Sequence, residues 1–108
     1  MICKVKENEY RISSGNGVGK IYRLLTNVPD NELDLAKLAI VFLKLQECIV
    51  VANAFNIYGD TIPDMTGVYI DKDKLDSEPY LFDKFHNTLL IMKEELEKQE
   101  EIDEIDKD

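Results

Sequence analysis

The chain has 108 residues, of which 44% are hydrophobic, so one domain with its own core is the expected arrangement. Its net charge is −9, and residues 60–108 carry sixteen acids against six bases. That balance argues against nucleic-acid binding through the body of the protein, because neutralising phosphates requires clustered Lys and Arg. Cys3 and Cys48 are the only cysteines, which excludes a disulfide scaffold and a CxxC pair.

We expect a cytoplasmic protein. No charged segment followed by a long apolar run opens the sequence, as a signal peptide requires. The most apolar stretch, residues 35–55, contains Lys37, Lys44, Gln46 and Glu47. These are too many polar groups for a helix that crosses a lipid bilayer.

Two strands are predicted at the start of the chain. Residues 2–13 alternate loosely between apolar and polar side chains, and residues 20–28 form a stronger strand pattern. Between them lies the glycine-rich sequence SSGNGVG, and its glycines supply the positive φ angles that hairpin connections use. The pattern predicts a β-hairpin.

Residues 33–58 predict a long central helix that is apolar over most of its circumference. One stripe with 3-4-3-4-3 spacing is typical of a helix that packs on another helix. Such a helix would be about 40 Å long, which is at least the width of a compact body of this size. We therefore expect self-association, most simply as a two-fold homodimer. The residues assigned to that interface are Leu35, Leu38, Phe42, Leu45, Gln46, Ile49 and Asn53.

Two members of this set are polar. Gln46 and Asn53 are seven residues apart on the predicted apolar stripe, and buried amides often fix the register of helical interfaces. The alternative is that Asn53 lies at the frayed end of the helix and that the Gln46 side chain reaches the rim of the interface.

The second half of the chain predicts a short third strand at residues 67–70, added to the edge of the hairpin. An amphipathic helix follows, which we expect to lie antiparallel on the long helix. Its apolar seam is Phe82, Phe85, Leu89, Met92 and Leu96. The chain is thus predicted to be α+β, with a single domain at residues 1–98 and an acidic C-terminal tail at residues 99–108.

The glycine-rich sequence resembles a phosphate-binding loop only superficially. Ser14 replaces its first glycine, and Ile21 replaces the hydroxyl residue that should follow Lys20. A strand pattern follows the loop, whereas a phosphate site needs a helix N-terminus there. The loop is therefore interpreted as a hairpin turn.

No other motif carries chemistry. Asp71, Asp73 and Asp76 do not form an EF-hand loop, because Phe82 stands where that loop requires a glutamate. His86 is the only histidine, so a site with several histidine ligands cannot form within one chain. We expect no catalytic residue, no cofactor and no metal site.

The sequence favours a non-enzymatic protein-binding or regulatory module. A narrower hypothesis is an acidic inhibitor of a nucleic-acid-binding protein, encoded by a phage or mobile element, whose carboxylates mimic phosphates on a basic surface. Lysine outnumbers arginine 11 to 2, which is typical of an AT-rich genome. The residues assigned to partner binding are Asp83, Glu94, Glu95, Glu97, Glu100 and Glu101. The alternatives are a small-molecule-binding or enzymatic domain with its site at the dimer interface, or a structural subunit of a larger assembly.

Overall fold

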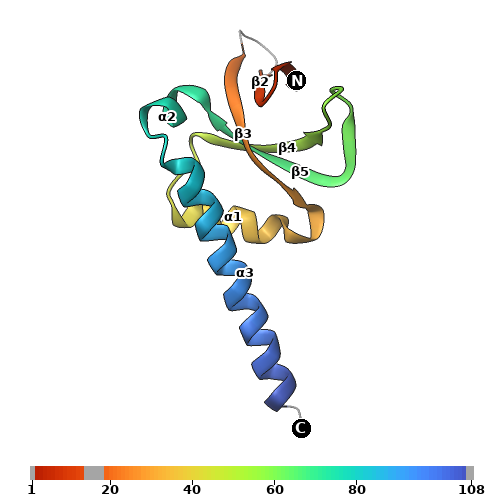
Figure 1. Cartoon of the computed structure of the whole chain (residues 1–108), viewed down its shortest axis with the longest axis vertical. Helices are drawn as coiled ribbons and strands as arrows, with labels where there is room; N and C mark the ends of the chain where they lie inside the picture. Colours follow the sequence, from red (N-terminus) through yellow and green to blue (C-terminus); the bar gives the residue numbers. More distant parts are fainter. Residues whose placement is uncertain (1, 14–18, 107–108) are drawn as a thin grey trace.

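The fold is a curled, five-stranded antiparallel sheet with helices packed on one face (Figure 1). The computed structural model describes residues 2–13 and 19–106, with side chains as far as Lys98. In chain order the elements are β1 (Ile2–Lys6), β2 (Glu9–Ile12), β3 (Lys20–Pro29), the 3-10 turn η1 (Asp30–Glu32), α1 (Leu33–Phe42), β4 (Ile49–Phe55), β5 (Thr61–Asp71), α2 (Lys72–Ser77) and α3 (Leu81–Asp106). The prediction of an α+β chain is confirmed.

The strand order is β1-β2-β3-β5-β4, and all neighbouring strands are antiparallel. Residues 2–13 form two strands instead of one, separated by a tight turn in which Asn8 has a φ of 65°. β2 pairs with β3, while residues 14–18 of the predicted hairpin loop lie outside the described residues. The predicted third strand is part of β5, which lies between β3 and β4 and not at an edge.

The predicted long helix is wrong. α1 ends at Phe42, and after a turn the chain enters β4 at Ile49. Lys44 adopts a positive φ of 60°, and the Leu45 N–H donates to the Ile40 carbonyl at 3.0 Å. The helix is therefore closed by a left-handed residue, a position that glycine usually occupies. A lysine there gives no sequence signal for the end of a helix.

The first part of β4 is apolar because side chains on both of its faces are at least partly buried. Ile49 and Val51 pack in the core on the helix side of the sheet, whereas Val50 lies opposite Tyr69 on the other side. A strand that is buried on both faces appears in sequence as a continuous apolar run, like a buried helix. The β-branched residues at 49–51 fit the strand, since their side chains pack well on a pleated surface.

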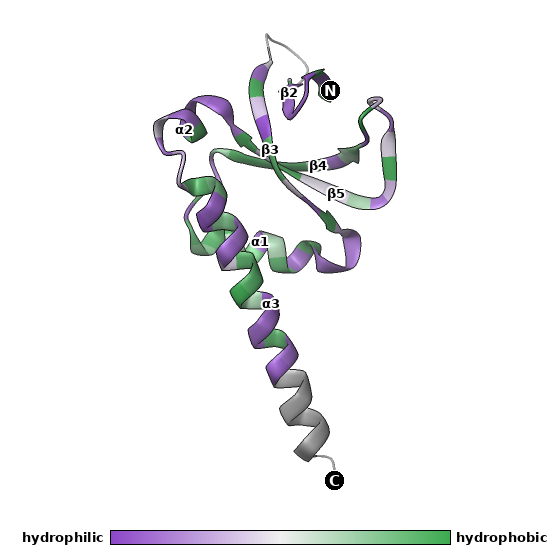
Figure 2. Ribbon diagram, in the orientation of Figure 1, coloured by the Kyte–Doolittle hydropathy of each residue, from purple (hydrophilic) through white to green (hydrophobic). Residues whose placement is uncertain are grey.

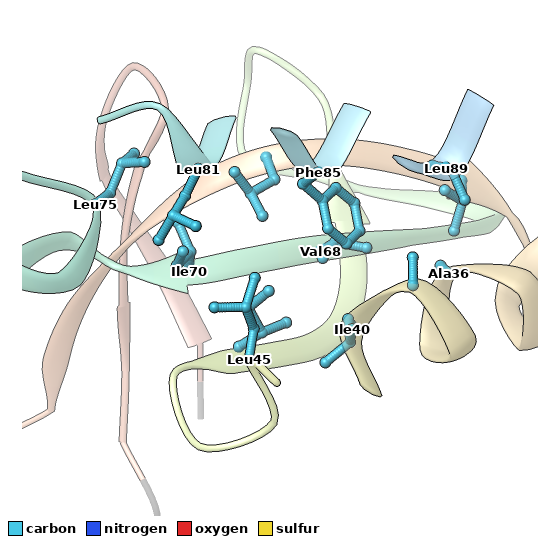
Figure 3. Packing of buried hydrophobic residues seen from close by; sticks show 13 residues of the cluster. Ala36, Ile40, Leu45, Val68, Ile70, Leu75, Leu81, Phe85 and Leu89 are labelled. Atoms are coloured by element: carbon cyan, nitrogen blue, oxygen red, sulfur yellow. The ribbon is translucent and has the colours of Figure 1, made fainter. Parts of the chain in front are cut away.

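The main core lies between the sheet and the helices (Figure 3). Phe85 of α3 is fully buried and lies over Val68 of β5. Ala36 and Ala39 of α1 are also fully buried in this cluster. Their small side chains allow α1 to approach its neighbours closely, because the distance between packed elements depends on the side chains at the contact.

The opposite face of the sheet holds a second, aromatic cluster. The rings of Tyr10 and Tyr69 are both buried, with centroids 4.9 Å apart, and Phe55 lies 5.9 Å from Tyr10. The Tyr69 hydroxyl donates to the Asn53 carbonyl at 2.6 Å. Gly67 leaves the room for this arrangement, because a Cβ at that position would collide with the Tyr69 ring.

The aromatic cluster predicts a loss of stability in alkali. Burial raises the pKa of Tyr69 and of Tyr10, so the folded protein retains protons that the unfolded chain releases. The free energy of unfolding should be independent of these groups below about pH 10 and should fall as the pH rises above it.

Urea denaturation of the Tyr69→Phe variant checks this interpretation. The free energy of unfolding of the variant should be about 1 kcal/mol lower at neutral pH, because the variant lacks the hydrogen bond to the Asn53 carbonyl. It should also lose less stability than the parent when the pH is raised from about 9 to about 11. Tyr58→Phe, at an exposed tyrosine, is the control and should change neither value. If Tyr69→Phe lost as much stability as the parent between these pH values, the loss could not be attributed to Tyr69.

Candidate functional site

The most distinctive surface of the protein is an apolar groove between α1 and α3. It is shallow and open to solvent, with a volume of about 490 Å³. Its lining residues are Leu35, Leu38, Val41, Phe42, Ile91, Met92, Glu95 and Leu96. Seven of these eight side chains are apolar, so the groove offers very few hydrogen-bonding partners.

The apolar side chains of the groove are well exposed. Phe42 is 70% exposed, Leu38 is 60% exposed and Ile91 is 59% exposed. Figure 2 shows hydrophobic residues on α1 and on the middle of α3, where the helices meet, and hydrophilic residues further along α3. Contiguous exposed apolar surface of this kind marks interaction sites in soluble proteins, whereas scattered single residues do not.

The groove exists because α3 is longer than the body that supports it. α3 has 26 residues, which corresponds to about 39 Å. Its buried side chains within the described part are Leu81, Phe85 and Leu89, and its C-terminal half projects past α1 (Figure 1). Leu96 therefore extends the apolar surface of the helix beyond the region that the core covers, and Ile91 is exposed on a different side of α3.

An adjacent hollow of about 390 Å³ continues the groove and is more polar. The two share Leu35, Leu38 and Leu96, so they form one surface. The residues that line only the adjacent hollow are Asn31, Glu32, Asp34, Lys93 and Glu97. Lys93 is paired with Glu32 at 3.1 Å, whereas Asp34 and Glu97 have no ion pair with any described residue.

Three of the residues predicted to self-associate lie together in this groove. Leu35, Leu38 and Phe42 occupy one side of α1, as their helical spacing predicted. Sequence reasoning assigned neither Val41 nor Ile91 to this surface, and it placed Met92 and Leu96 on a helix–helix seam. The signal for Ile91 was present in the four consecutive apolar residues at 89–92, which place apolar side chains on more than one side of a helix.

The other four predicted residues lie elsewhere. Leu45 and Ile49 belong to the core of this same chain. The interpretation of Gln46 and Asn53 as amides on one helical stripe is wrong, because Gln46 lies in the turn after α1 and Asn53 lies on β4, where both are exposed in this chain. The single stripe that joined all seven residues required helical spacing beyond Phe42, where the helix ends.

The residues predicted to bind a partner all lie on α3. Asp83, Glu94, Glu95 and Glu97 are exposed and form no ion pair with the described part of the chain. Glu95 lines the apolar groove itself. The side chains of Glu100 and Glu101 lie outside the described residues.

The acidic cluster at residues 71–76 has structural roles. Asp71 caps α2 by accepting from the Asp73 N–H at 2.9 Å. Asp76 pairs with Lys72 at 2.9 Å and with Arg23 at 3.3 Å. The hydrogen bond from Lys72 is the main reason that the pKa of Asp76 is lowered. Among the residues that the structure describes, no group of three or more His, Cys, Asp and Glu could hold a metal ion.

His86 and Cys48 likewise have local partners. The Phe82 carbonyl lies 2.7 Å from His86 Nδ1, and the two rings are 4.5 Å apart. The Cys48 thiol lies 3.5 Å from the Leu45 carbonyl, and burial raises its pKa, which lowers the fraction of reactive thiolate. Lys74, Asp71 and Glu78 are charged neighbours of Cys48, and each affects its pKa less than burial does.

Comparison with known protein families, with curated proteins and with solved structures gave no match to this chain. Within the described residues, no helix combines the length and the apolar character needed to cross a membrane. The functional proposal rests on the groove, because exposed apolar side chains from two helices line it.

The exposure of the groove predicts that its side chains contribute little to folding. Leu38→Ala and Phe42→Ala should each change the free energy of unfolding by less than about 0.5 kcal/mol. Ile40→Ala, on the buried side of the same helix, should cost about 2–5 kcal/mol. Urea denaturation monitored by circular dichroism checks both values. A large loss of stability in Phe42→Ala would show that the groove is part of the core.

Proposed function

We propose that this protein is a non-enzymatic protein-binding module and that the apolar groove between α1 and α3 is its docking surface. The observation that carries the proposal is the exposed apolar lining contributed by both helices. Full burial of one such side chain contributes about 1.5–3 kcal/mol. Burial of Leu38, Phe42 and Ile91 by a partner would therefore supply much of the free energy of a specific complex.

A helix fits this groove better than an extended strand. The lining side chains come from two helices, so the surface offers no free backbone N–H and C=O groups to pair with a strand. An amphipathic helix would place apolar residues at i, i+3, i+4 and i+7 against Leu35, Leu38 and Leu96.

A homodimer through the same groove is the second candidate. Phe42 is exposed in the lining of the groove, and a two-fold interface could bury it against the groove of a second copy. The narrower hypothesis of an acidic inhibitor draws support from Asp83, Glu94 and Glu97, which are exposed and without ion pairs in the described structure. The homodimer and the acidic inhibitor would both bind through α3.

Selection from a displayed library of amphipathic helical peptides tests the proposal. The library fixes leucines at the i, i+3, i+4 and i+7 positions and draws the flanking polar positions equally from Lys and Glu. Peptides selected on the parent protein are then measured against Leu38→Glu, which places a charge in the groove. We expect binding to weaken by about tenfold or more, because the new carboxylate must be desolvated.

Ile57→Glu is the matched control, because Ile57 is 77% exposed and lies outside the groove. Its affinity for the same peptides should stay within about twofold of the parent value. Circular dichroism must first show that both variants are folded. Peptides that bind Leu38→Glu as tightly as the parent protein, or a library without binders, would contradict the proposal.

A further inference from the structure

The charged residues that line the groove and the adjacent hollow are four acids and one base. Glu95 lines the groove, and Asp34 and Glu97 line the adjacent hollow. None of these three carboxylates forms an ion pair with a described residue. Lys93 is the one base in the lining of the two hollows, and its pairing with Glu32 at 3.1 Å neutralises it. The rim therefore presents unpaired negative charge around an apolar floor.

The same sign of charge continues along α3 away from the groove. Residues 94–106 of this helix contain eight acids and one lysine. A segment that enters the groove and follows α3 would remain within a few ångströms of this helix. Charges at that distance are screened only partly at physiological salt, where the Debye length is about 8 Å.

A second copy of this chain is a poor occupant for electrostatic reasons. Each copy has a net charge of −9 and carries the same acidic helix beside its groove. A two-fold dimer through this surface would bring two such rims together, and like charges across an interface oppose association. A positively charged partner would instead be attracted to the same rim.

We infer that the groove binds an amphipathic helix of another protein whose apolar face is flanked by lysine and arginine residues. The inference rests on the proposed function and adds the chemistry of the partner. Apolar residues of that helix cover Leu38, Phe42 and Ile91, while its basic residues pair with Asp34, Glu95 and Glu97. The apolar contacts supply affinity, and the charges supply selectivity and rate of association.

Two synthetic peptides with the same leucine positions test the inference. One carries Lys and Arg at every flanking position, and the other carries Glu at those positions. In fluorescence anisotropy at about 50 mM salt, the basic peptide should bind about tenfold or more tightly than the acidic one. At about 500 mM salt the ratio should shrink towards one, since salt screens exposed charge pairs.

A pair of double variants locates the effect. Glu95→Gln with Glu97→Gln removes two rim charges and should weaken binding of the basic peptide about fivefold or more. Glu7→Gln with Glu47→Gln is the matched control, because it makes the same change in net charge at exposed positions outside both hollows. Binding to the control should change less than twofold, as expected for distant, screened charges.

Three results would overturn the inference. Equal binding of the acidic and basic peptides, with both lost in Leu38→Glu, would refute the basic partner and leave the docking groove standing. A concentration-dependent dimer in sedimentation velocity that Leu38→Glu abolishes would identify a second copy as the occupant. Absence of any binding that depends on Leu38 would refute the groove and the inference together.

Discussion

The structure depends on the burial of Phe85 of α3 against β5. Phe85 and Val68 have no exposed surface, and the remaining buried residues of both helices gather around them (Figure 3). Replacing a fully buried phenylalanine by alanine typically costs about 3–5 kcal/mol, which is a large part of the stability of a domain. The contact also fixes where α3 leaves the sheet, and therefore which part of the helix is left without cover.

The groove follows from this arrangement. α3 is anchored by residues in its first half, and α1 packs against it. Met92 is the last residue of the described part of α3 whose side chain packs against the core. Leu96 lies beyond Met92, and Ile91 lies on a side of the helix that the core does not cover, so both are exposed and line the groove with Leu38. Exposed apolar surface that contributes nothing to folding is costly to keep, because it favours aggregation. In the proposed function a partner covers this surface, and the negative charges of α3 would oppose its burial against a second copy of this chain.

The sequence allowed the fold class and part of the groove to be predicted. The spacing of Leu35, Leu38 and Phe42 was read correctly because these residues lie on a helix. The extension of the helix to Ile49 was wrong, because this residue pairs with β5 as part of a strand. No glycine marks the end of α1 in the sequence. The groove could not be predicted completely, since it depends on the crossing of two helices that are far apart in the sequence. Its charge could be predicted, because acids dominate α3 in the sequence itself.

The central claim is that a basic amphipathic helix occupies the space between α1 and α3. Titration of the isotope-labelled protein with the basic peptide, followed by two-dimensional NMR of its backbone amides and methyl groups, tests it most directly. The account predicts that signals of Leu35, Leu38, Val41, Ile91 and Leu96 shift most, and that those of the aromatic cluster around Tyr69 remain unchanged. Shifts concentrated on β4 or on the strands of the opposite face would contradict the account and place the binding surface elsewhere.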